Sequence, residues 1–280
     1  MFGIRSEPLS VEKITVAIAD LPATLQGTKI VQLSDFHYGT GELSELLLAQ
    51  AIDITNQQSA DLVVLTGDFV TDDPNPIYNL VLKLKHIQSR QGVYAILGNH
   101  DRFYRRSQAV ITRVLQQAGI QVLWNDIVYP FGKELPLVGL AEFWSREFFP
   151  GSILSQIDPA IPRIVLSHNP DTAAILQQWR VDLQLSGHTH GGQIILPYGI
   201  GALPKHLGAI RKYIPKFIRK FLPYLGKDCD KIVKNWQWSQ GFHRVGDNCL
   251  YVNRGLGSYF PGRFNCPPEV TVITLTRQEF

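Results

Sequence analysis

Five short clusters of aspartate, histidine and asparagine carry the residue types best suited to chemistry in this 280-residue sequence. In chain order, the clusters are Asp35-Phe36-His37, Gly67-Asp68, Gly98-Asn99-His100-Asp101, His168-Asn169 and Gly187-His188-Thr189-His190. Their carboxylate, imidazole and amide groups, with no cysteine among them, suit divalent ions such as Mn, Fe or Zn. Residues two apart in an extended segment point the same way, so Asp35 and His37 can aim at one place. The same holds for His188 and His190, and the clusters therefore predict metal binding.

The clusters also fit a pair of metal ions. Asp68 can hold both ions, one through each of its carboxylate oxygens. Two ions about 3.5–4 Å apart can share a hydroxide, lower the pKa of its parent water and stabilise both oxygens of an in-line phosphoryl displacement. The expected activity is therefore hydrolysis of a phosphate ester by a metal-bridged hydroxide.

Each cluster taken alone has an ordinary structural explanation. An Asp or Asn after a strand is usually a turn former or a helix N-cap, and Gly191-Gly192 alone is typical of a hairpin turn. A lone histidine is usually structural or solvated. The five clusters together hold five of the eight histidines, which favours a site over these explanations. His86, His206 and His243 lie outside the clusters and keep the structural explanation.

The elements that must position the clusters are short strands of a layered α/β protein. Each cluster follows a short apolar run rich in β-branched residues, at 29–34, 61–66, 93–97, 163–167 and 181–186. Helix-period stretches lie at 42–58, 77–89, 107–118 and 171–179, and further strands are predicted at 135–140, 194–196, 250–253 and 270–275. The steps Asp35 to Asp68 and Asp68 to Asn99, 33 and 31 residues long, match the about 30 residues of one β–helix–β unit. The five loops should therefore meet beyond the carboxyl ends of parallel strands, where open α/β sheets place ligands.

Composition fits a globular protein with a sizeable core. Hydrophobic residues make up 45%, charged residues 18%, and the mean hydropathy is −0.02. Cys229, Cys249 and Cys266 form no C-x-x-C pair, so neither a disulfide scaffold nor a thiolate zinc site is expected. No apolar run approaches the roughly 18 residues of a membrane-spanning helix, and residues 1–7 show no secretory signal. Because Phe2 also excludes N-myristoylation, we expect a cytoplasmic protein.

The net charge of +3 comes from one segment at about residues 201–227, which holds seven basic residues and no acid. At about 100° per residue, its apolar side chains fall on one side of a helix and most basic ones on the other, with Pro215 interrupting the helix. Either the apolar side packs on the domain, or the segment is an interfacial helix on an anionic membrane, on the inner face. In the second case the membrane-facing residues are Lys212, Lys216, Phe217, Arg219, Lys220 and Phe221.

The five clusters resemble the pattern of the calcineurin-like metallophosphoesterase superfamily. The matching residues are Asp35-x-His37, Gly67-Asp68, Gly98-Asn99-His100-Asp101, His168 and Gly187-His188-x-His190. The resemblance implies a four-layer α/β/β/α sandwich with two mixed β-sheets. We expect a single domain over residues 1–280, with the basic amphipathic segment at about 201–227 as an insertion.

The resemblance also implies a ligand set for two divalent metal ions. One ion would be held by Asp35, His37, Asp68 and His190, and the other by Asp68, Asn99, His168 and His188. His100 would lie near the leaving-group oxygen, and Asp101 would fix the tautomer of its imidazole. No ligand position is substituted, which argues against a non-catalytic metal-binding scaffold.

The C-terminal part is similar to a bacterial branch related to membrane-associated phosphodiesterases. The similarity lies in Arg254-Gly255-Leu256-Gly257 and in Arg263-Phe264-Asn265-Cys266-Pro267-Pro268-Glu269. That branch includes enzymes that hydrolyse the pyrophosphate of UDP-diacylglucosamine, so a phosphodiester or pyrophosphate substrate, lipid-linked in one version, is implied. Arg254, Arg263 and Asn265 are candidate substrate-binding residues, although a purely structural role of this turn-rich stretch explains them equally well.

A nuclease is the main competing hypothesis, with the basic segment tracking a nucleic-acid backbone. The aromatic residues of that segment lie on or beside its apolar side, not interleaved with the basic groups as a base-stacking platform requires. Nucleic acid is therefore the less favoured partner.

Overall fold

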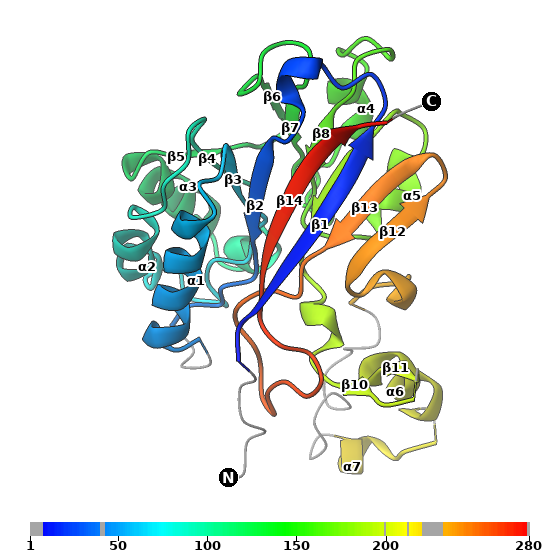
Figure 1. The fold of residues 1–280 in the computed structure, drawn as a ribbon. Helices are drawn as coiled ribbons and strands as arrows, with labels where there is room; N and C mark the ends of the chain where they lie inside the picture. Colours follow the sequence, from blue (N-terminus) through cyan, green and yellow to red (C-terminus); the bar gives the residue numbers. More distant parts are fainter. Residues whose placement is uncertain (1–7, 40–42, 199, 212, 220–231, 279–280) are drawn as a thin grey trace.

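The computed structural model describes residues 8–39, 43–198, 200–211, 213–219 and 232–278. Its first sheet has six strands in the order β1-β14-β2-β3-β4-β5 (Figure 1). Their bounds are β1 Ser10–Ile18, β14 Glu269–Arg277, β2 Lys29–Leu33, β3 Leu62–Leu65, β4 Val93–Ala95 and β5 Ile120–Val122. The sheet is mixed because β14 runs antiparallel to β2, whereas every other neighbouring pair is parallel.

The second sheet also has six strands, in the order β12-β13-β9-β8-β7-β6. Their bounds are β12 Gly241–Val245, β13 Asn248–Val252, β9 Leu183–Ser186, β8 Ile164–Leu166, β7 Leu137–Gly139 and β6 Asp126–Val128. The four central strands are parallel, and β12 and β6 are antiparallel at the two edges. This arrangement leaves the carboxyl ends of β8 and β9 side by side.

Helices cover the outer faces of the two sheets, as the fold prediction requires. Helices α1 (Glu45–Gln57), α2 (Ile77–Leu84) and α3 (Ser107–Gln117) lie against the first sheet, and α4 (Pro150–Leu154) and α5 (Thr172–Leu176) against the second (Figure 1). Neighbouring residues of a strand serve different layers: Val63 packs under the helices, whereas Leu62 and Val64 pack between the sheets. The predicted four-layer α/β/β/α sandwich with two mixed sheets is confirmed.

The strands that were predicted to precede the chemical clusters are all present, as β2, β3, β4, β8 and β9. The four predicted helices also form, with shorter bounds than the sequence suggested. Ser44 caps α1, since its hydroxyl accepts a hydrogen bond from the Leu47 N–H at 3.1 Å. Gly119 adopts a left-handed conformation directly after α3, as a helix C-terminal glycine does.

The described part of the basic segment, residues 201–211 and 213–219, forms short elements. After η3, the 3-10 turn His190–Gly192, the chain forms β10 (Ile195–Leu196), β11 (Gly201–Ala202), α6 (Leu203–Arg211) and α7 (Lys216–Arg219). Pro215 lies between α6 and α7, in agreement with its expected effect on the helix. Lys212, Lys220 and Phe221 lie outside the described residues, and so do the side chains of Lys216 and Phe217. The Nε of Arg219 donates to the Ile214 carbonyl at 2.5 Å.

Among the described residues, every helix is too short or too polar to cross a membrane.

Candidate metal centre

The two sheets bring the chemical clusters together at one edge of the sandwich. Asp35, Asp68 and Asn99 follow β2, β3 and β4 of the first sheet. His37 lies in the same loop as Asp35, and the remaining candidate ligands, His168, His188 and His190, follow β8 and β9 of the second sheet. Because the strands of each set are parallel, their carboxyl ends point the same way, and loops from two different sheets supply one site.

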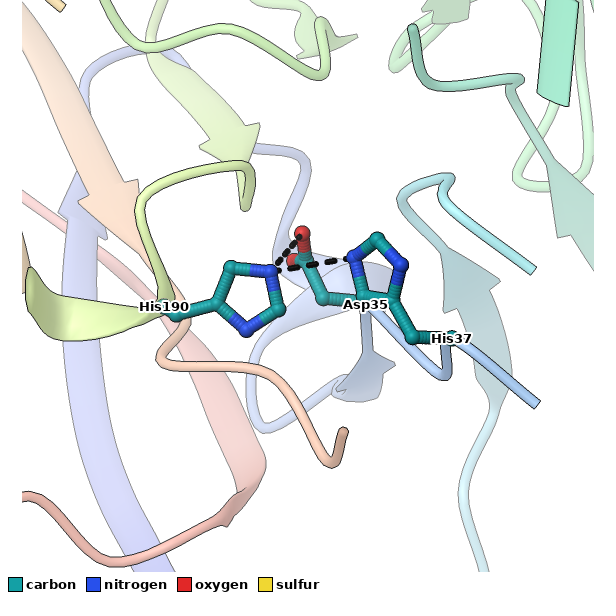
Figure 2. Close-up of side chains that lie close together, drawn as sticks. All are labelled: Asp35, His37 and His190. Carbon is teal, nitrogen blue, oxygen red and sulfur yellow. Dashed lines mark hydrogen bonds and ion pairs between the residues drawn. The ribbon is translucent and has the colours of Figure 1, made fainter. Parts of the chain in front are cut away.

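One group of ligands consists of Asp35, His37 and His190, all buried, with their ligand atoms within 4.8 Å of one another. Figure 2 shows the three side chains pointing toward one another. The Nε2 atoms of His37 and His190 are 3.0 Å apart, and the His190 Nε2 lies 3.6 Å from the Asp35 Oδ1. Two imidazole nitrogens this close, flanked by a carboxylate, form the kind of site that holds a borderline divalent ion.

The second group consists of Asp68, His168 and His188, also buried and within the same 4.8 Å limit. The His168 Nε2 lies 3.2 Å from the Asp68 Oδ2 and 3.2 Å from the His188 Nδ1. The same Asp68 Oδ2 is 3.5 Å from the His37 Nε2 of the first group. Asp68 therefore lies between the two groups, where a bridging carboxylate must lie.

Asn99, in the loop after β4, has an unpaired acceptor. Its Oδ1 atom is buried and has no hydrogen-bond partner among the described residues. A buried amide oxygen without a partner costs free energy, of the order of 1–3 kcal/mol, unless a cation or water satisfies it. An amide oxygen is an accepted ligand of divalent cations. Together with the two groups of ligands, this orphaned oxygen indicates that the residues fit a dinuclear metal centre.

Carbonyl oxygens behind the ligands fix which imidazole nitrogen faces the site. The His168 Nδ1 lies 2.7 Å from the Thr66 carbonyl oxygen, and the His190 Nδ1 lies 3.2 Å from that of Gly257. The His188 Nε2 lies 3.3 Å from the carbonyl oxygen of Ile232. A carbonyl can only accept, so each of these nitrogens carries the proton, and the other nitrogen of each ring is left as the ligand.

The backbone of the ligands is strained. Asp35, His37, Asp68, His188 and His190 all have positive φ angles, between 44° and 73°. Such angles are uncommon for residues other than glycine, and backbone strain of this kind clusters at functional sites because the surrounding structure enforces it. The concentration of strain on five ligands therefore supports a functional role for this edge of the sandwich.

Two glycines allow the backbone to approach the carboxylates. A Cβ atom on Gly98 would lie 2.1 Å from the Asp68 Oδ1, and one on Gly187 would lie 2.2 Å from the Asp35 Oδ2. Both distances are far below a van der Waals contact. The glycines of the third and last clusters are thus needed for space beside the carboxylates.

Asp68 and His168 form the electrostatic centre of the site. Burial raises the pKa of Asp68, but the nearby His168 and His100 outweigh this effect and hold its pKa well below the usual value. Burial lowers the pKa of His168, whereas the Asp68 carboxylate raises it more strongly, to about 10. For His188, burial and the charge of His168 lower the pKa to about 3. The site thus holds a proton on His168 beside the Asp68 carboxylate, in a place where a cation can replace it.

His100 lies beside the second group with part of its side chain open to solvent, at 26% exposure. Its backbone N–H donates to the Asp68 Oδ1 at 2.9 Å. The ring Nδ1 lies 2.6 Å from the carbonyl oxygen of Thr71, so the Nε2 points away from this carbonyl. A partly open imidazole next to buried ligands is suitably placed to exchange a proton with a substrate.

The structure corrects the expected role of Asp101. Its buried carboxylate accepts hydrogen bonds from four backbone N–H groups, those of Gly98, Asp68, Phe69 and Val70. Among the described residues, no hydrogen bond joins it to the His100 ring, whose tautomer is instead fixed by Thr71. Asp101 therefore holds the loops after β3 and β4 together, and it positions Asp68 instead of His100.

Of the two roles considered for Arg254 and Arg263, the structure favours the structural one. Arg263 is only 1% exposed, and its guanidinium donates to the carbonyl oxygens of His190, Arg254, Gly255, Gly257 and Cys266. Arg254 forms ion pairs with Glu12 at 2.5 Å and Glu269 at 2.9 Å. Neither guanidinium is therefore free to bind a phosphate. Asn265 is exposed and donates to the Ile195 carbonyl at 3.3 Å, so its role in substrate binding stays a prediction.

Two aromatic residues beside the site were missed by the sequence analysis. The Tyr259 hydroxyl lies between His37 and His100, 2.8 Å from the Nδ1 of the first and 3.1 Å from the Nε2 of the second. The Trp144 ring meets the His188 ring edge-on at 5.1 Å between centroids. Both lie in loops without a strand end directly before them, so only the position of Tyr259 shortly after the glycine-rich run at 255–257 could have signalled it.

Comparisons with known proteins agree with this geometry. Residues 28–192 match the family model described as calcineurin-like phosphoesterase. Phosphodiesterase YaeI of Escherichia coli is 30% identical over 251 residues, covering 88% of this chain and 82% of that protein. UDP-2,3-diacylglucosamine pyrophosphatase LpxG of Chlamydia muridarum is 27% identical over 303 residues, covering 90% and 84%. The crystal structure of a dimetal phosphatase from Danio rerio shares the fold, with a TM-score of 0.50 at 12% identity over 84% of this chain and 90% of that one.

Proposed function

We propose that this chain, a member of the calcineurin-like phosphoesterase family, hydrolyses a phosphodiester or pyrophosphate bond at a dinuclear metal centre. The observation that carries this proposal is the position of the Asp68 carboxylate. It lies 3.2 Å from His168 in one buried group of ligands and 3.5 Å from His37 in the other. One carboxylate shared by two groups is what a two-ion phosphoryl-transfer site requires.

The side chains have two roles: some hold the ions, and one moves a proton. Asp35, His37, Asp68 and His190 would hold one ion, and Asp68, Asn99, His168 and His188 the other. When bound, the ions supply Lewis acidity and lower the pKa of bound water. Asp101 holds the loop that carries Asp68, through backbone hydrogen bonds of 2.8–3.3 Å. The partly exposed His100 donates a proton from its Nε2 to the leaving-group oxygen.

We propose further that the substrate is lipid-linked, such as UDP-diacylglucosamine. Two relatives at 27% and 28% identity are named UDP-2,3-diacylglucosamine pyrophosphatase, and each match covers 90% of this chain. Exposed aromatic rings adjoin both sides of the site: Trp144 is 52% exposed beside His188, and Phe103 is 65% exposed and stacks on His100. Such rings offer flat and apolar contacts to the groups attached to the scissile phosphate.

A substrate panel tests this proposal. The full chain, loaded separately with Mn, Fe or Zn, is assayed with bis-p-nitrophenyl phosphate, UDP-2,3-diacylglucosamine, single-stranded DNA and p-nitrophenyl phosphate. We expect metal-dependent turnover of the diester and faster turnover of the lipid-linked pyrophosphate, both lost on chelation. Preference for DNA would indicate a nuclease instead. A folded, metal-loaded chain that turns over none of the four compounds would be a non-catalytic scaffold, and the proposed reaction would be wrong.

We further propose that the basic segment at 201–227 binds an anionic membrane surface. Its seven basic residues are accompanied by no acid, and described hydrophobic residues nearby in the chain are exposed, among them Tyr198, Ile200, Tyr213 and Ile218. Basic residues near an anionic bilayer each contribute about 1 kcal/mol, and this attraction is screened by salt. Binding of this segment to a membrane would place the site beside a lipid-linked substrate.

The expected result is co-sedimentation of the chain with anionic vesicles but not with zwitterionic ones, weakened as salt is raised. Charge reversal of Lys212, Lys216 and Lys220 to Glu should abolish this binding. Reversal of three exposed lysines elsewhere, Lys13, Lys85 and Lys133, is the matched control and should leave most of it. Equal binding of both vesicle types, without a salt effect, would show that the segment serves only to pack on the protein.

A further inference from the structure

Tyr259 occupies the space between a metal ligand and the proposed proton donor. Its hydroxyl lies 2.8 Å from the His37 Nδ1, 3.1 Å from the His37 Nε2 and 3.1 Å from the His100 Nε2. Its ring also packs on three imidazoles, at centroid distances of 4.7 Å to His37, 5.2 Å to His190 and 5.9 Å to His100. Tyr259 thus contacts both the proposed ion site and the proposed proton donor.

The loop that carries Tyr259 is fixed from the second sheet. The Tyr259 backbone N–H donates to the Gln193 Oε1 at 2.5 Å, and the Gln193 Nε2 donates back to the Tyr259 carbonyl at 3.3 Å. Gln193 directly follows the 3-10 turn that contains His190. Hydrogen bonds to Gln193 therefore fix the Tyr259 backbone relative to the neighbouring candidate ligand His190.

Hydrogen-bond partners lie on both sides of the Tyr259 hydroxyl. The His100 Nδ1 is 2.6 Å from the Thr71 carbonyl oxygen, which only accepts, so in the neutral ring the Nε2 carries a lone pair. The Tyr259 hydroxyl can donate to that lone pair. On the other side, the hydroxyl lies 2.8 Å from the His37 Nδ1, which is also 3.1 Å from the Thr71 Oγ1. The phenol therefore links His37 to His100, and Thr71 contacts both imidazoles.

We propose that Tyr259 is a positioning residue of the hydrolysis, which acts through His100 by hydrogen-bonding its Nε2 and tying it to the ligand His37. This inference rests on the proposed role of His100. When the P–O bond breaks, the Nε2 proton of charged His100 passes to the leaving-group oxygen, and the Nε2 is left with a lone pair. The Tyr259 hydroxyl donates to this lone pair and keeps its own proton. Tyr259 thus lies beside the Nε2 throughout and satisfies it once the proton has left.

The test is a double-mutant cycle with Tyr259→Phe and His100→Asn in the metal-loaded full chain. Tyr259→Phe should lower kcat by about 10- to 100-fold, the range typical for partners that orient a working imidazole. It should cause no further loss in the His100→Asn background, because residues that act through one another are not additive. The loss should be larger for a diester with phenol as leaving group than for one with p-nitrophenol, which needs less help from a proton donor. Tyr129→Phe, at an exposed tyrosine, is the matched control.

Three results would overturn the inference. The first is an equal loss from Tyr259→Phe with and without His100. The second is an equal loss for both leaving groups, and the third is loss of bound metal from the Tyr259→Phe variant, measured by elemental analysis. A crystal structure of the metal-loaded wild type gives a readout apart from activity, since the phenol hydroxyl should remain within hydrogen-bond distance of the His100 Nε2. If the wild type has no metal-dependent activity, the proposed function fails, and this crystal structure still decides whether Tyr259 holds His100.

Discussion

Replacing Asp68 with asparagine should reduce the metal-dependent hydrolysis of bis-p-nitrophenyl phosphate to the level of the metal-free protein. The amide keeps the shape of the carboxylate but lacks the negative charge and one of the two oxygens. Asp68 is the residue that contacts His37 in one group of ligands and His168 in the other. Its loss therefore affects both ion sites at once, whereas the loss of any other ligand affects one.

His188→Ala should also abolish the reaction, by removing an imidazole from the second group.

The measurement combines initial rates with elemental analysis of bound metal and a circular dichroism spectrum to confirm folding. Asp53→Asn is the matched control, because Asp53 is exposed on α1 and the chemical change is identical. It should leave both the rate and the metal content unchanged. Undiminished turnover by a folded, metal-loaded Asp68→Asn or His188→Ala protein would show that the reaction does not take place at this centre.

Replacing His100 with asparagine should leave both ions in place but lower the rate by about 10²–10⁴-fold, the usual contribution of a general acid or base. At about 1.36 kcal/mol per tenfold change, this is a loss of about 2.7–5.4 kcal/mol in transition-state stabilisation. The metal should stay because the link from residue 100 to Asp68 is a backbone N–H, which the substitution preserves. The asparagine amide cannot transfer a proton as the imidazole does.

Rates and metal content of His100→Asn are compared with those of His86→Asn, an exposed histidine that carries the same substitution without a role in the site. The control should match the wild type in both measurements. If His100→Asn loses metal in proportion to its activity, then His100 is a ligand, and its assignment as a proton donor is wrong.

The family and the general fold could be predicted from the sequence because the relevant signals are local. Each cluster follows directly on an apolar run, and the runs become β2, β3, β4, β8 and β9. A strand that is buried on both faces is apolar over most of its length, so its end is visible where a cluster of Asp, Asn or His begins. The predicted family resemblance is confirmed by the match over residues 28–192.

Strand β1 shows what the sequence could not reveal. Its polar residues Glu12, Lys13 and Thr15 interrupt the apolar pattern because it is an edge strand with one open side. Its only sheet partner among the described residues is β14, more than 250 residues later in the chain. Pairing across such a separation leaves no local trace, and the strand went unpredicted.

The arginines of the C-terminal part could not be assigned from the sequence for a related reason. Their residue type suits a phosphate as well as a carbonyl or a carboxylate, and only the folded structure decides between them. Arg263 lies behind His190 and donates to backbone carbonyls, and Arg254 meets Glu12 from the opposite end of the chain. The role of Asp101 was misassigned similarly, since its four backbone partners come from loops that meet only after folding.

The insertion of β14 between β1 and β2 orders events during synthesis on the ribosome. Ile273 pairs with Ile14 on one side and with Ile30 on the other, so the two N-terminal strands never touch as neighbours in the sheet. Both are translated long before β14 and gain that partner only after it. Until then the nascent polypeptide exposes unpaired strand edges, which are the places where foreign strands attach. The first sheet is therefore completed only after β14 has been translated.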